Sequence, residues 1–254
     1  MAQIHAERHV LFLVFIFLVL GVTSLILVFA LQTDPVEEVL KNDQLIRMLI
    51  VLEDQGEPIS TTVLAYYPVS RRGALFDILG NTGAIWSSLG RVDRIAEVYK
   101  EKGIEIYKKE IETLTGMQIP FTVEIGLADF GKLTDLLEGL RVLVPYPVDV
   151  EIDSNRYLLP SGAVILDGDK IQTYLTYSIP EETISDKQDR TQNAVVAFLA
   201  ALNNNKARVF TEKNFKQYSK LMRVNIDKEG CFRLFSEISS IDAERLIPQA
   251  ITGS

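Results

Sequence analysis

One uninterrupted apolar run dominates the hydrophobic pattern at the start of the chain. Residues 10–31, VLFLVFIFLVLGVTSLILVFAL, contain no charged side chain and nothing more polar than Thr23 and Ser24. At about 1.5 Å of rise per residue, a helix of this length crosses a hydrocarbon core of about 30 Å. The pattern therefore predicts a membrane-spanning helix, and no later segment repeats an apolar run of this length.

A cleaved secretory signal is the alternative interpretation of this run. The apolar region of such a signal usually covers only about 7 to 15 residues and ends in small residues. Because Ala30-Leu31-Gln32 fits that ending poorly, we favour an uncleaved anchor. Arg8 precedes the run and Asp34 follows it, which predicts a cytoplasmic amino terminus.

The expected organisation is thus a single-pass protein of the cell membrane with one exported, extracytoplasmic (periplasmic or external) domain. Its parts are a cytoplasmic tail at 1–9, a transmembrane signal-anchor at 10–31, a linker at 32–44 and the extracytoplasmic domain at 45–254.

Beyond residue 45, short β-prone runs alternate with amphipathic helical segments. Strands are expected at 46–53, 60–69, 74–79, 119–125 and 141–150. Helices are expected at 95–114 with a break at Gly103, at 129–137, 167–177 and 191–202, and again within 203–254. This alternation predicts an α/β fold in which helices sandwich a mixed central sheet.

Charge and cysteine content limit the possible partners of the protein and the ways in which its exported domain can be stabilised. The formal net charge of -8 and the absence of a basic tract argue against a nucleic-acid partner, which needs a clustered basic surface. The single cysteine, Cys231, cannot form an internal disulfide, so an apolar core must hold the exported domain together.

Several motifs in the exported domain occur in a characteristic order. They are GRVDRIAEVY, then IEIYKKEIETLTGMQIPFTVEIGLADFGKLTDLLEGLRVLVP, then LPSGAVILDGDKIQTYLTY, DRTQNAVVAFLAAL and VNIDKEGCFRLF. After a single anchor, this order resembles the LytR-CpsA-Psr family of envelope proteins, whose outside domain handles polyprenyl-linked glycopolymers. The resemblance implies an α-β-α domain of that family's type from about residue 45 to the end.

The resemblance also implies where a charged pocket would lie. In the family, an aspartate after the first strand, an S-I-P-R-D-T turn and an R-x-R pair converge on a pyrophosphate and its magnesium ion. The matching positions here carry no charge: they are Ser60, Gly80, Asn81, Thr82, Thr176 and Ser178. Without guanidinium forks and carboxylates, both pyrophosphate neutralisation and magnesium binding are expected to be lost.

We therefore name no catalytic residue, no metal ligand and no cofactor, and expect Mg²⁺ only if the family's chemistry is retained. The candidate ligand-binding residues are Arg190, Lys187, Asn81, Thr82 and Tyr174. The acidic residues around Glu182 are interpreted as a solvated loop. A Ser-His-Asp constellation is excluded because both histidines, His5 and His9, precede the apolar run.

Three functional hypotheses remain open. The favoured one is a non-catalytic family relative, a pseudoenzyme, that binds a polyprenyl-type lipid or serves as an envelope scaffold for other envelope proteins. The second is a phosphotransferase that moves a glycopolymer from a polyprenyl pyrophosphate carrier to the cell wall. The third is an unrelated anchored sensor or adhesion module.

Overall fold

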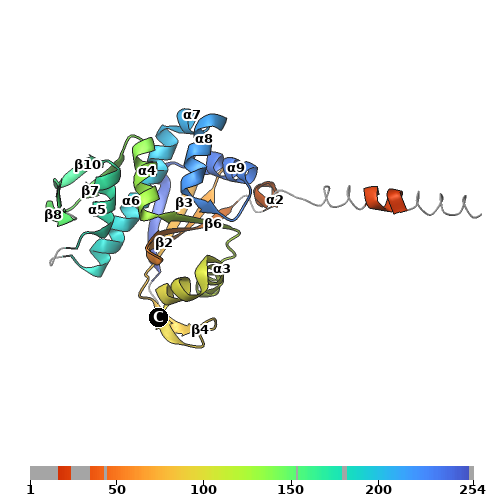
Figure 1. Cartoon of the computed structure of the whole chain (residues 1–254), viewed down its shortest axis with the longest axis horizontal. Helices are drawn as coiled ribbons and strands as arrows, with labels where there is room; N and C mark the ends of the chain where they lie inside the picture. Colours follow the sequence, from red (N-terminus) through yellow and green to blue (C-terminus); the bar gives the residue numbers. More distant parts are fainter. Residues whose placement is uncertain (1–16, 24–34, 43–44, 153, 179–181, 252–254) are drawn as a thin grey trace, which may run out of the picture.

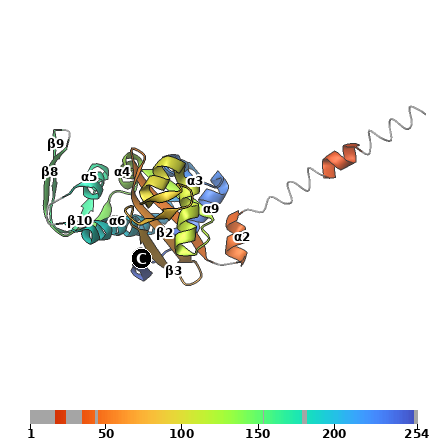
Figure 2. The same cartoon turned by 90° about the horizontal axis from the view of Figure 1, so that it is seen from below.

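The computed structural model describes residues 17–23, 35–42, 45–152, 154–178 and 182–251. From residue 45 on, these residues form an α/β domain around one six-stranded sheet (Figure 1). Short two-stranded sheets project from two sides of the domain, one at β8 and β10 and the other at β4 (Figures 1 and 2).

The central sheet has the strand order β11-β6-β1-β2-β3-β12 and mixed strand direction. β1 pairs parallel with β6 and antiparallel with β2, and β3 pairs antiparallel with β2 and parallel with β12. The strands are β1 (Ile46–Asp54), β2 (Glu57–Tyr67), β3 (Arg72–Ile78), β6 (Phe121–Gly126), β11 (Arg223–Val224) and β12 (Leu246–Ile251). With helices on its faces, this sheet confirms the predicted α/β class.

The central strand β1 is apolar on both faces because helices cover both. Leu49 and Val51 belong to a core cluster with α3 (Ile95–Thr115), whereas Met48 and Ile50 face a larger cluster that includes α6 (Ile184–Asn204). Buried strands of this kind are nearly continuous apolar runs rather than alternating ones.

The remaining helices surround the larger cluster (Figure 1). They are α2 (Pro35–Asn42), α4 (Leu127–Leu136), α5 (Gly168–Thr176), α7 (Lys206–Val209), α8 (Glu212–Tyr218) and α9 (Lys228–Ile238), with single 3-10 turns η1 (Ser219–Leu221) and η2 (Ala243–Arg245).

The predicted break in the helix 95–114 lies at Gly103. Its φ of 74° and ψ of 179° are not helical, and only glycine adopts this combination readily. The break redirects the second half of α3, so that Tyr107 packs edge-on against Tyr99 with ring centroids 5.3 Å apart.

Three two-stranded antiparallel sheets lie outside the central sheet. They pair β4 (Gly83–Trp86) with β5 (Arg91–Arg94), β7 (Leu140–Val144) with β10 (Gly162–Leu166), and β8 (Val148–Ile152) with β9 (Asn155–Leu159). Figure 2 shows the β8–β9 hairpin at the far side of the domain from α2.

Two expectations about secondary structure were wrong. The strand expected at 141–150 is divided between β7 and β8, because Pro145 and Pro147 lie between them and proline cannot continue a strand ladder. The region 203–254 was expected to be helical, yet its last described segment is β12, an edge strand of the central sheet.

The predicted anchor at 10–31 lies largely outside the described residues. Residues 17–23 of that run are described and are helical. Within the described part of the chain, no helix has the length and apolar character that a bilayer crossing requires.

Candidate functional site

A cavity of about 420 Å³ opens where β2 begins and β3 ends, next to the ends of α5 and α6. Its walls bring together positions that are far apart in the sequence: Ser60, Gly80, Asn81, Thr176, Lys187 and Gln188, with apolar neighbours such as Ile59, Leu79 and Leu175. These include most of the positions at which the family pattern places its charged pocket. We call this cavity the cleft.

The turn at 79–82 forms one wall of the cleft and is fastened to the start of α3. The Thr82 N–H donates to the carbonyl of Leu79 (2.9 Å), and Ala96 N–H donates to the carbonyl of Gly80 (3.1 Å). A Cβ atom added at Gly80 would lie 3.6 Å from the Ala96 Cβ, an ordinary contact. The fold therefore accepts a side chain at position 80, and the lack of an arginine there is a property of the sequence.

The cleft carries little charge. Lys187 is the one ionisable side chain among the described residues that line it, and it is exposed. Ser60, Asn81 and Thr176 supply neutral oxygens and an amide. Among the described residues, no group of three or more His, Cys, Asp or Glu side chains is placed to hold a metal ion.

Arg190 does not line the cleft. The residue is 2% exposed, and its guanidinium lies 3.0 Å from the Glu182 carboxylate and donates a second hydrogen bond to the carbonyl of Tyr177 at 2.9 Å. The guanidinium carbon also lies 3.8 Å from the centre of the Tyr177 ring. Arg190 thus fastens α6 to the segment that follows α5, and Glu182 is a buried ion-pair partner rather than part of a solvated loop.

The other two candidates, Tyr174 and Thr82, are also not among the residues that line the cleft. Tyr174 is fully buried, and its hydroxyl donates to the carbonyl of Leu143 (2.9 Å) and accepts from the Asn193 amide (3.2 Å). Burial raises the pKa of Tyr174 to about 12, so the phenol stays neutral at physiological pH. Thr82 is 7% exposed and acts through its backbone in the turn.

Asp77 is a buried carboxylate that the sequence analysis did not single out. It is 4% exposed and lies opposite Thr62 on the neighbouring strand, whose hydroxyl donates to Asp77 Oδ1 at 2.6 Å. Asp77 Oδ2 has no hydrogen-bond partner in the part of the chain that the structure describes, and burial raises the pKa of this carboxyl to about 6. An acidic residue in the strand-like segment ALFDIL was the available signal.

Gln188 presents a second buried polar atom without a partner. Its Nε2 makes no hydrogen bond among the described residues, although the residue lines the cleft. An amide donor in that position suits an oxygen atom of a bound molecule.

The space between the sheet and α6 is closed. An apolar cavity there, lined by Met48, Ile50, Phe130 and Phe198 among others, has a volume of about 20 Å³. That is about the space of one water molecule, whereas pockets for organic ligands have volumes of about 300 to 1,000 Å³.

Comparisons with known proteins bear on this arrangement. The model of the LytR_cpsA_psr family matches residues 71–254. The chain belongs to this family. A search of curated proteins finds no match.

Solved structures of family-like proteins share the fold at low sequence identity. TagV of Bacillus subtilis is 18% identical, with a TM-score of 0.72 over 83% of this chain and 85% of its own. Protein gbs0355 of Streptococcus agalactiae is 14% identical, with a TM-score of 0.72 over 87% and 80% of the two chains. TagT, in a structure with LI-WTA bound, is 14% identical, with a TM-score of 0.63 over 82% and 78%.

Proposed function

We propose that this family member is a membrane-attached, extracytoplasmic protein of the cell envelope that does not transfer phosphoryl groups and acts as a scaffold for other envelope proteins. The observation that carries the proposal is the cleft: at the family's charged positions it holds Ser60, Gly80, Asn81 and Thr176, with Lys187 as its one cation among the described residues.

Phosphoryl transfer depends on clustered positive charge and on a bound metal ion, and the described lining of the cleft provides neither. Catalysis of that reaction consists largely of positioning and of electrostatic stabilisation by cations and metal ions. Magnesium requires hard, negatively charged oxygen ligands to compete with water, and neutral Ser60 and Asn81 do not provide them.

The surroundings of the cleft favour a scaffolding function over the binding of a polyprenyl lipid. The Arg190 guanidinium is committed to Glu182 and Tyr177, so an incoming phosphate would have to break a buried ion pair. The space of about 20 Å³ between the sheet and α6 would have to open many-fold before it received a prenyl chain.

A second candidate function, binding or transfer of a polyprenyl-linked wall polymer, is favoured by one observation. Gln188 and Lys187 line the same cavity of about 420 Å³, and each carries an N–H donor without an ion-pair or hydrogen-bond partner among the described residues. The structure of TagT with LI-WTA bound makes a lipid-linked wall polymer the ligand class to test.

Purified full chain, incubated with a polyprenyl pyrophosphate and Mg²⁺, tests both candidates. We expect no release of phosphate and no saturable binding of the pyrophosphate. The matched variant Ser60→Asp/Gly80→Arg/Asn81→Asp restores the family's residues at three cleft positions, and shows whether the assay detects a charged cleft on this fold. Magnesium-dependent turnover by the wild-type chain would overturn the proposal.

Scaffolding has its own test in cells. If the cleft is not used chemically, Lys187→Ala/Gln188→Ala should complement a deletion of the gene as well as the wild type does. Loss of complementation by a stably folded, membrane-located variant would favour the second candidate.

A further inference from the structure

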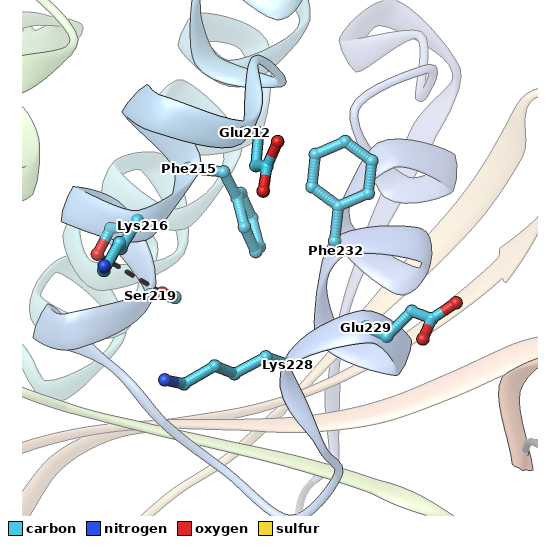
Figure 3. Close-up of a pocket in the computed structure, with 7 residues that line it drawn as sticks. All are labelled: Glu212, Phe215, Lys216, Ser219, Lys228, Glu229 and Phe232. Atoms are coloured by element: carbon cyan, nitrogen blue, oxygen red, sulfur yellow. Dashed lines mark hydrogen bonds between the residues drawn. The ribbon is translucent and has the colours of Figure 1, made fainter.

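A groove of about 500 Å³ lies between α8 and α9 and shares no lining residue with the cleft. Figure 3 shows Phe215 of α8 and Phe232 of α9 facing its interior, with Lys228 below them and Lys216 at the left, beside Ser219. It is separate from every position in the family's charged pocket.

The floor of the groove is a rigid aromatic cluster. The rings of Phe215 and Phe232 meet edge to face with centroids 5.1 Å apart, and Phe210 packs against both. Phe215 is 6% exposed and Phe232 is half-buried, so the groove presents apolar ring surface that the domain itself leaves uncovered.

The rim of the groove has more available positive than negative charge. Lys216 and Lys228 form no ion pair with any described residue. Of the two carboxylates, Glu229 contacts Arg233 at 3.4 Å and points away from the groove in Figure 3, whereas the Glu212 carboxylate lies next to Phe215 in the upper part of that view. Two free ammonium groups beside apolar rings suit an anionic group that carries an apolar chain.

The groove also lies close to the predicted anchor. α2 packs on α9: Val36 is fully buried, and its Cγ2 lies 3.6 Å from the position that a Cβ of Gly230 would take. Gly230 is two residues from both Lys228 and Phe232. Four residues lie between Leu31, the end of the apolar run, and Val36. The five Cα-to-Cα steps between them span at most about 18 Å.

We infer that the groove between α8 and α9 binds an anionic phospholipid of the membrane to which the chain is attached. The phosphate would lie between Lys216 and Lys228, and the upper part of an acyl chain would lie against Phe232 and Phe215. This inference rests on the proposed membrane attachment and is independent of what the cleft does. Its consequence is that the domain is held with one defined face toward the bilayer.

The test uses the full chain in lipid nanodiscs, one copy per disc, made of phosphatidylcholine alone or with phosphatidylglycerol added. Hydrogen exchange is followed over residues 212–232. We expect exchange in this segment to slow several-fold in the anionic discs relative to the neutral ones, with little change elsewhere in the domain.

Two charge-reversal variants separate a built site from general attraction. Lys216→Glu/Lys228→Glu should remove the protection, whereas Lys213→Glu/Lys220→Glu makes the same change of net charge at neighbouring lysines outside the groove and should keep it. Equal loss with both variants would show diffuse attraction and overturn the inference.

Other results would identify other occupants or remove the premise. Protection that is equal in neutral and anionic discs, or that appears only with two copies per disc, would overturn the lipid inference, and the latter would indicate a second copy of the chain. A full chain that does not enter discs would overturn the membrane attachment and this inference together, while leaving the assay of the cleft unaffected.

Discussion

Arg190 Nη2 lies 3.0 Å from Glu182 Oε2, and both side chains are almost fully withdrawn from solvent, with 1% and 6% of their surfaces exposed. The same guanidinium nitrogen donates to the Tyr177 carbonyl, so one side chain joins α6 to the segment after α5. Two guanidinium nitrogens, Nε and Nη1, are buried and have no hydrogen-bond partner among the described residues. The ion pair therefore fixes how α6 packs on the segment after α5, although it leaves two buried guanidinium donors without hydrogen bonds to described residues.

Arg190→Ala should lower the free energy of unfolding by about 3 to 5 kcal/mol, because it leaves the Glu182 carboxylate buried without a partner. Urea unfolding at neutral pH measures this. Arg156→Ala is the control, since Arg156 and Asp149 form an exposed pair whose loss should cost less than about 1 kcal/mol. If Arg190→Ala left stability unchanged but weakened binding of a polyprenyl phosphate, Arg190 would be a ligand residue after all.

Asp77 should make stability depend on pH. The folded-state pKa of about 6 lies above the unfolded value of about 3.9, so the folded protein binds this proton more tightly. The contribution to stability is complete below about pH 4 and is lost as the pH rises through about 6, by an amount on the order of 3 kcal/mol.

Asp77→Asn should remove that dependence and should be more stable than the wild type at pH 8. Its amide oxygen can still accept the hydrogen bond from Thr62. Urea unfolding between pH 4.5 and 8 checks this, with the exposed Asp169→Asn as control. A wild-type chain whose stability rises between pH 4.5 and 6.5, with no change of slope in Asp77→Asn, would contradict the assignment.

The α/β domain from residue 45 on should fold without a metal ion. We expect the melting temperature of the wild type to be the same with EDTA and with Mg²⁺, because the cleft has no carboxylate among its described lining residues. Ser60→Asp/Asn81→Asp places two carboxylates on one cavity and should gain stability from Mg²⁺, by about 2.7 kcal/mol when the ion is at a hundred times its Kd.

The neutral variant Ser60→Asn is the matched control for that gain, since it changes size without adding charge. A fall in the wild-type melting temperature with EDTA, reversed by Mg²⁺, would show that metal ligands lie elsewhere in the domain.

Gly103→Ala should destabilise the domain by about 1 to 3 kcal/mol, since alanine does not readily adopt a φ of 74° with a ψ of 179°. An added Cβ would meet no atom within 4 Å, so the cost is one of backbone conformation alone. Gly83→Ala, also in open space but without a positive φ, should change stability by less than about 0.5 kcal/mol. Equal effects of the two variants in thermal unfolding would contradict this account.

That break in α3 also bears on the cleft. The second half of the helix brings the Tyr107 hydroxyl within 2.8 Å of the Thr61 hydroxyl, and Thr61 lines the cleft. Gly103→Ala should therefore disturb the cleft as well as the helix, which amide exchange in β2 would report.

Periodicity and turn residues predicted the parts of the fold that depend on local sequence. The break at Gly103 could be predicted because glycine permits a backbone that other residues avoid, and the broad α/β class followed from alternating strand-like and helical runs. β12 could not be predicted, since it is short and contains Pro248. Proline is tolerated there because β12 forms an edge of the sheet.

The candidate site was likewise predictable only in part. The convergence of Ser60, Asn81, Thr176 and Lys187 on one cavity follows from motif order, which fixes where each position falls in a shared fold. The burial of Arg190 does not follow from it. Its environment depends on how Tyr177 and Glu182 pack after α5, and the polar composition around Glu182 gave no sign of a buried partner.

The pairing of β3 with β12 has a consequence for how the protein reaches its folded state. Leu246 pairs with Gly73, so most of the domain lies between two strands that must meet. Contacts of such long range form slowly, and an unpaired strand edge is a template for other chains. If the domain is exported as proposed, with β3 crossing the membrane before β12, the edge of β3 stays uncovered until β12 emerges. The extent of aggregation should therefore depend on the time during which the β3 edge is exposed before β12 pairs with it.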